Sequence, residues 1–175
     1  MLFDAPPSAT RLEGDVWVRI GDDASATVRP LVQREKNQSQ AQLSPDQRWV
    51  AYVSDEAGPN DVFVAEFRAG ATAAVGPGQG VRISEGGGFA PRWRRDGREL
   101  FYLMRDGSVL ALTVDTGQEF RPGKATRLFR TPDVISDWGV TPDGSRFLFA
   151  VPVSQPPPLQ ILENWQATLP KPAPR

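Results

Sequence analysis

A proline-aspartate turn runs into an apolar segment in the stretch Leu43-Ser44-Pro45-Asp46-Gln47-Arg48-Trp49-Val50-Ala51-Tyr52-Val53. Related stretches occupy residues 93–103 and 140–149. Their aspartates, Asp46, Asp96 and Asp143, lie 50 and 47 residues apart. A period of about 40 to 50 residues built from short strands is typical of arrays in which each unit buries its apolar face on the next. The stretch is therefore an internal repeat, and it predicts a modular β fold.

The turn has a physical logic of its own. A proline presets φ near about −65° at the first central position, and an aspartate can bond the amide two residues further on. A glycine accepts positive φ where the chain enters the next strand. Strand-connecting turns are therefore predicted at Ser44, Pro45 and Asp46, at Asp96 and Gly97, and at Thr141, Pro142, Asp143 and Gly144.

The strand pattern predicts an all-β fold. Each turn is followed by an almost continuous apolar run, at 49–53, 100–103 and 147–151, which indicates a strand buried on both faces. Other strands recur in step with the turns, so that a full unit has four antiparallel strands. We predict a partial β-propeller of about three and a half blades. Its parts are residues 1–36 (incomplete), 37–86, 87–133 and 134–169 (incomplete), followed by a proline-rich tail at 170–175.

Composition limits the chemistry that this chain can perform. Its 175 residues include no cysteine and no histidine, which excludes thiolate catalysis, a Ser-His-Asp triad and the common zinc sites. Lysine and arginine number 20 against 21 aspartates and glutamates, so no positive excess favours nucleic acid as a partner. No run of about 18 apolar residues is present, and no membrane span is expected in this chain.

At the repeated turns and their flanking strands, the sequence resembles the TolB-like, WD-repeat-like β-propeller family, whose blades carry a Trp-Ser-Pro-Asp-Gly-Lys/Arg signature. Residues 43–67, 84–114 and 159–165 look similar to the carboxy-terminal sensor propeller of acidobacterial-type serine/threonine protein kinases. Gln47 in place of glycine, and Arg94 and Arg95 in place of Ser-Pro, depart from the signature. The resemblance implies a bacterial sensor module, periplasmic or extracytoplasmic, in a longer protein whose kinase domain lies elsewhere.

Three carboxylates, Asp55, Glu56 and Asp61, could come together from neighbouring units, as glycoside hydrolysis requires. The interpretation as solvated turn and loop residues is favoured, because no Ser-x-Asp-x-Gly box accompanies them. We therefore predict a non-catalytic module that binds a protein or small ligand, is not an enzyme, and has no catalytic, cofactor-binding or metal-binding residues. The alternative is a carboxylate-dependent carbohydrate- or peptide-active enzyme.

The densest basic cluster consists of Arg92, Arg94, Arg95 and Arg98. It could offer an anion or an acidic peptide several donors around one turn. The competing interpretation is a solvated loop whose arginine stems lie over Trp93. An unclosed array would also expose strand edges and apolar faces, so either a homodimer or missing upstream blades are expected to complete the ring.

Overall fold

The computed structural model describes residues 2–5, 15–20, 26–32, 36–68, 75, 80–131 and 135–152. All regular structure in these ranges is β-strand, in four antiparallel sheets. The predicted all-β class and antiparallel sheets are confirmed. The motif at 159–165 and the tail at 170–175 lie outside the described residues.

Each sheet is formed by strands that follow one another along the chain, and no described strand crosses over to pair with a non-consecutive one. The first sheet contains β1 (Leu2–Ala5), β2 (Asp15–Ile20) and β3 (Thr27–Val32). The second contains β4 (Gln38–Leu43), β5 (Trp49–Ser54), β6 (Asp61–Glu66) and β7 (Val81–Arg82). The third contains β8 (Phe89–Trp93), β9 (Glu99–Leu103), β10 (Ser108–Asp115) and β11 (Arg121–Arg130). The fourth contains β12 (Asp137–Val140) and β13 (Phe147–Ala150).

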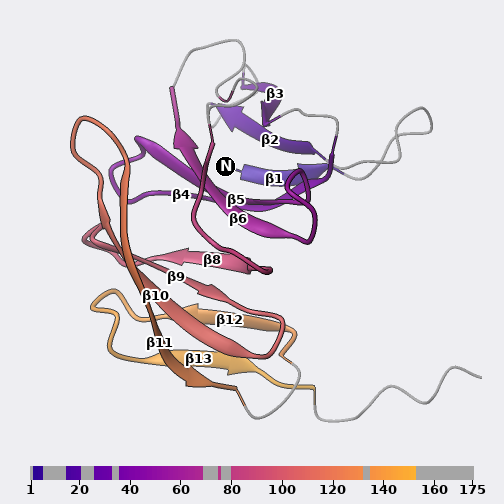
Figure 1. Ribbon diagram of the computed structural model, residues 1–175. Helices are drawn as coiled ribbons and strands as arrows, with labels where there is room; N and C mark the ends of the chain where they lie inside the picture. Colours follow the sequence, from indigo (N-terminus) through magenta and orange to yellow (C-terminus); the bar gives the residue numbers. More distant parts are fainter. Residues whose placement is uncertain are drawn as a thin grey trace, which may run out of the picture.

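The sheets pack on one another in chain order, with the first and fourth at opposite ends of the molecule (Figure 1). Apolar clusters fill each interface between neighbouring sheets. Val16 and Leu31 of the first sheet meet Tyr52 of the second, and Val64 of the second meets Leu100 of the third. A further cluster joins the third sheet to the fourth, where Phe101 and Val109 pack with Trp138, so each inner sheet is covered on both faces.

The predicted propeller is wrong. The first to fourth sheets have three, four, four and two described strands, and they do not close into a ring. The repeated turn and its apolar strand specify one sheet and its burial on both faces. Closure depends instead on the angle between neighbouring sheets and on how many sheets follow, and neither quantity is encoded in a short motif.

The first repeated turn is held together by the carboxylate of Asp46. Its Oδ1 accepts hydrogen bonds from the Ser44 hydroxyl (2.5 Å) and the Arg48 amide (3.1 Å). In the second turn Asp96 Oδ1 accepts from the Arg98 amide at 3.0 Å. The residue after the aspartate has positive φ in both turns, 57° at Gln47 and 72° at Gly97. Gln47 and Gly97 therefore both have left-handed φ values, although one residue carries a side chain and the other does not.

The aspartate of the third turn accepts more hydrogen bonds than the aspartates of the other two turns. Asp143 Oδ1 accepts from the Thr141 hydroxyl (2.5 Å) and the Ser145 amide (3.1 Å), and Oδ2 accepts from the Ser145 hydroxyl (2.7 Å). These bonds, with that from Thr141 the largest cause, hold the pKa of Asp143 well below its usual range. Gly144 supplies the positive φ, at 75°.

The matched turns allow a reciprocal test of backbone strain. Left-handed backbone costs a residue with a side chain on the order of 1 kcal/mol relative to glycine. Gln47→Gly is therefore expected to raise the free energy of unfolding by up to about 1 kcal/mol, and Gly97→Gln to lower it by a similar amount. A Cβ at Gly97 would lie 3.9 Å from its nearest neighbours, so crowding adds little there. Urea unfolding measures both changes, and shifts of the same sign would contradict the assignment.

The pKa of Asp143 predicts a pH-dependent stability. A carboxylate whose native pKa is depressed adds stability above its unfolded pKa, about 3.9, and this contribution is lost as pH falls through the native value. The melting temperature of Asp143→Ala is therefore expected to lie below that of the wild type at pH 7. The gap should narrow as the pH is lowered below about 4. Thermal melts between pH 7 and pH 3 measure it, and a gap that stays constant would count against this account.

Candidate functional site

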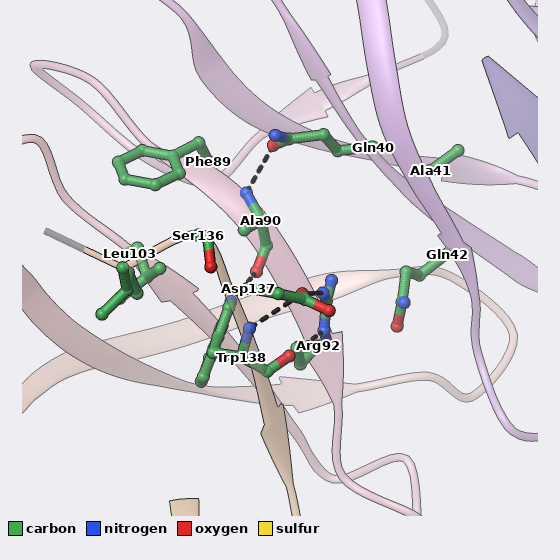
Figure 2. A pocket seen from close by; sticks show the side chains of 11 residues that line it. Gln40, Ala41, Gln42, Phe89, Ala90, Arg92, Leu103, Ser136, Asp137 and Trp138 are labelled. Atoms are coloured by element: carbon green, nitrogen blue, oxygen red, sulfur yellow. Dashed lines mark hydrogen bonds and ion pairs between the residues drawn. The ribbon is translucent and has the colours of Figure 1, made fainter. Parts of the chain in front are cut away.

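A cavity of about 410 Å³ lies where β4, β8 and β12 come next to one another. These are the first strands of the second, third and fourth sheets. Its polar lining comes from Gln40, Gln42, Arg92, Ser136 and Asp137 (Figure 2). Phe89, Leu103, Ile135 and Trp138 supply apolar lining. The cavity therefore combines a few polar groups with an apolar wall, as small-molecule sites do.

Irregularities in two strands shape this cavity. The pairing of β4 with β5 shifts register between Ser39 and Gln42, and that of β8 with β9 shifts between Phe89 and Arg92. Within these bulges Gln40 has a φ of 53° and Ala90 a φ of 51°. Bulges and left-handed residues that are not glycine are enriched beside functional sites.

The two bulges are joined directly, because the Ala90 amide donates to Gln40 Oε1 at 2.7 Å (Figure 2). The apolar pattern of the sequence does not reveal these bulges. One signal was available: Pro91 follows Ala90, and proline within a sheet is confined to edges and bulges.

Arg92 is the fixed cation of the cavity. Its Nε donates to the Trp138 carbonyl (3.1 Å), its Nη1 to the Pro91 carbonyl (2.9 Å), and its Nη2 lies 3.1 Å from Asp137 Oδ1. The guanidinium carbon lies 5.7 Å from the centroid of the Trp138 ring, and the Trp138 indole N–H donates to the Ala90 carbonyl at 3.0 Å. These contacts set the position of the positive charge while leaving donors of the guanidinium for a ligand.

The structure divides the predicted arginine cluster. Arg92 lines the cavity, whereas Arg94 forms ion pairs with Glu99 (2.8 Å) and Asp96 (3.4 Å). The hydrogen bond to Glu99 is the main reason that the pKa of Arg94 is raised. Arg95 and Arg98 are exposed in the turn that follows β8, outside the lining of the cavity. The four arginines therefore do not form one site.

The predicted carboxylates lie at the connection between β5 and β6, where Ser54 pairs with Asp61, and none of them lines the cavity. Asp55 accepts hydrogen bonds from the amide (2.8 Å) and the side chain (2.9 Å) of Asn37. Glu56 is half-buried in the turn that joins β5 to β6. Asp61 is completely buried at the start of β6. Asp137, which the sequence analysis did not single out, is the carboxylate that lines the cavity.

Asp61 organises the loop between β7 and β8. Its Oδ1 accepts from the Ser84 hydroxyl (2.9 Å) and the Gly87 amide (3.0 Å), and its Oδ2 lies 2.5 Å from Arg82 Nη2. Burial, followed by the charge of Asp61, raises the pKa of the nearby Tyr102 phenol. The amide of this glycine-rich loop therefore binds a carboxylate of the protein itself, and the loop leads directly into the bulged strand β8.

In the described part of the chain, no group of three or more aspartates or glutamates is placed to hold a metal ion. Nor does that part contain a helix long and apolar enough to cross a membrane.

Asp61 gives a testable prediction about stability. Asp61→Ala is expected to lower the free energy of unfolding by about 2–3 kcal/mol, because Ser84, Gly87 and Arg82 lose a buried acceptor. Arg82 is partly exposed, which keeps the loss below that of a fully buried pair. The matched control is Asp55→Ala, whose carboxylate is less buried and should cost less than about 1 kcal/mol. Equal losses in urea unfolding would contradict the assignment.

No protein-family model matches the chain. Among solved structures, a match is the crystal structure of a protein from Bacteroides uniformis ATCC 8492, provisionally assigned as a 6-phosphogluconolactonase. The TM-score is 0.53 at 12% sequence identity, and the match covers 78% of this chain and 40% of the other. The chain thus spans about two fifths of the length of that protein. Similarity at this identity shows a related, lactonase-like β fold.

These comparisons correct two expectations. The resemblance to TolB-like propellers and kinase sensor domains is not supported, because no family model matches and the structural similarity is to a lactonase-like protein. An aspartate turn is a general way of connecting strands, so its repetition indicates a series of connected strands and does not identify a protein family. The expectation that the chain is not an enzyme is contradicted as well, since the matched protein is assigned as an enzyme. Lack of histidine and cysteine excludes particular mechanisms, but not chemistry by arginine and aspartate.

Proposed function

We propose that this chain carries the substrate pocket of a carbohydrate-active, lactonase-like enzyme, and that the cavity between β4, β8 and β12 is that pocket. The observation that carries the proposal is the Arg92–Asp137 pair, held at 3.1 Å on the lining of the cavity. The structural similarity to a protein assigned as a 6-phosphogluconolactonase favours a carbohydrate over a peptide as the substrate class. This chain spans about two fifths of the length of that protein. The enzymatic activity of a complete protein is therefore also part of our proposal.

The dimensions and lining of the cavity support a sugar-sized ligand. Its volume of about 410 Å³ falls within the range of about 300–1,000 Å³ that is usual for small-molecule sites. The amides of Gln40 and Gln42 and the hydroxyl of Ser136 can bond sugar hydroxyls as donors or acceptors. Phe89 and Trp138 offer apolar surface to the C–H groups of a ring.

The Arg92–Asp137 pair can supply two of the roles that lactone hydrolysis requires, a donor to the carbonyl oxygen and an acceptor for the proton of water. Water adds to the lactone carbonyl carbon, the bond from that carbon to the ring oxygen breaks, and the ring oxygen takes a proton as the carboxylic acid forms. Negative charge develops on the carbonyl oxygen, where fixed donors such as those of Arg92 stabilise it. Asp137 has a side chain that is 75% exposed, so water can reach it, and we assign it to accept the proton of the attacking water.

The assignment of Arg92 is tested by the rate of lactone hydrolysis. Arg92→Met is expected to lower kcat/KM for an uncharged sugar lactone, gluconolactone, by about 100-fold, because the loss of an oxyanion donor typically costs that much or more. Arg92→Lys should recover only part of the rate, since an ammonium cannot reproduce the forked contacts of a guanidinium. The rate is measured as proton release above the uncatalysed background.

Arg98→Met is the matched control, because Arg98 is an exposed arginine of the same predicted cluster but lies outside the cavity. Its rate should equal that of the wild type. Equal rates in Arg92→Met and wild type, or equal losses in both arginine variants, would overturn the assignment of the pocket.

A further inference from the structure

A second cavity of about 270 Å³ adjoins the proposed substrate pocket. The two cavities share Gln40 and Phe89 as lining residues. Beyond this shared wall the second cavity is lined by Ser39, Asn60 and Arg105, together with Val53. The two hollows are therefore neighbours across this wall, and we call them the first and second compartments.

The second compartment contains a cation, the exposed side chain of Arg105. Its charged lining residue is Arg105, whose stem lies against the Ser84–Gly88 loop: a Cβ built on Gly87 would come within 3.4 Å of Arg105 Cδ. Gly87 has a φ of 107°, and its amide is bound by the buried carboxylate of Asp61 at 3.0 Å. The surface on which the Arg105 stem rests is thus fixed by a fully buried group.

The charges of the two compartments differ. In the first, Arg92 is balanced by Asp137 at 3.1 Å, so a ligand there meets a neutral pair. In the second, the positive charge of Arg105 is accompanied only by polar and apolar lining residues. The first compartment therefore suits an uncharged sugar unit, and the second suits a unit that carries a negative charge.

We propose that the two compartments bind one acidic glycan of at least two sugar units, with the neutral unit beside Arg92 and the anionic unit beside Arg105. This inference rests on the proposed function, and it specifies the substrate class of the same site. A monosaccharide would fill the first compartment alone. Gln40, which lines both compartments and bonds the Ala90 amide, lies where the two sugar units would be linked.

The anionic group can be a carboxylate or a phosphate, and the probes separate these sources. Isothermal titration calorimetry on the 175-residue chain would compare cellobiose, its glucuronic-acid-terminated counterpart, cellobiose carrying a 6′-phosphate, and free glucuronic acid. At least one acidic disaccharide is expected to bind at least ten-fold more tightly than cellobiose, and more tightly than glucuronic acid. Arg105→Met should abolish this advantage, so that acidic and neutral disaccharides bind with similar affinity, while Arg105→Lys should retain part of it.

Arg98→Met again serves as the control, and it should keep the full preference for the acidic disaccharide. The inference is overturned if neither acidic disaccharide binds more tightly than cellobiose, or if Arg105→Met weakens neutral and acidic disaccharides equally. It is also overturned if glucuronic acid binds as tightly as the disaccharide. Lactone hydrolysis that depends on Arg92 without any preference for acidic disaccharides would defeat this inference alone. Absence of both hydrolysis and sugar binding would defeat the proposed function as well.

Discussion

Burial of the inner strands on both faces is the constraint on which the rest of the structure depends. All six residues of β5 are buried: Val50 and Tyr52 pack toward the first sheet, while Ala51 packs toward the third. Burying a large apolar side chain contributes about 1.5–3 kcal/mol, so the second sheet loses this stabilisation on one face if either neighbour is removed. The sheets are consequently interdependent. At the far end of the molecule the requirement is relaxed, since Leu148 on β13 is 68% exposed.

This packing also brings the first strands of successive sheets together. Trp93 on β8 donates its indole N–H to the carbonyl of Gln42 on β4 at 3.2 Å. Trp138 on β12 repeats the contact one sheet further on, donating to the carbonyl of Ala90 on β8 at 3.0 Å. Each tryptophan thus fixes its own strand to the corresponding strand of the preceding sheet. The cavity lies among these strands, so its walls are positioned by the same contacts that hold neighbouring sheets in register.

The sequence predicts the sheets much better than it predicts the site. Continuous apolar runs such as 49–53 have one physical explanation, burial on both faces, and the structure agrees. Ring closure was not predictable in the same way, because it depends on angles between sheets. The arginine cluster shows the other limit: Arg92 lies on the strand and Arg98 in the turn, so proximity in sequence did not bring them into one site. Asp137 joins Arg92 from 45 residues away, which only the packing of the sheets determines.

The strained residues of the cavity differ in kind from the strained residue of the turn. Gln47 corresponds to Gly97 and Gly144 of the other two turns. A glycine can therefore adopt the same backbone conformation, and the turn does not need a side chain at this position. At Gln40 glycine would relieve the same positive φ but would remove the acceptor that bonds the Ala90 amide. That amide lies in a bulge, where the ladder to β9 is interrupted and cannot supply a regular partner. The side chain of Gln40 therefore compensates for the irregularity that opens the cavity, and the strain at this position is tied to the shape of the site.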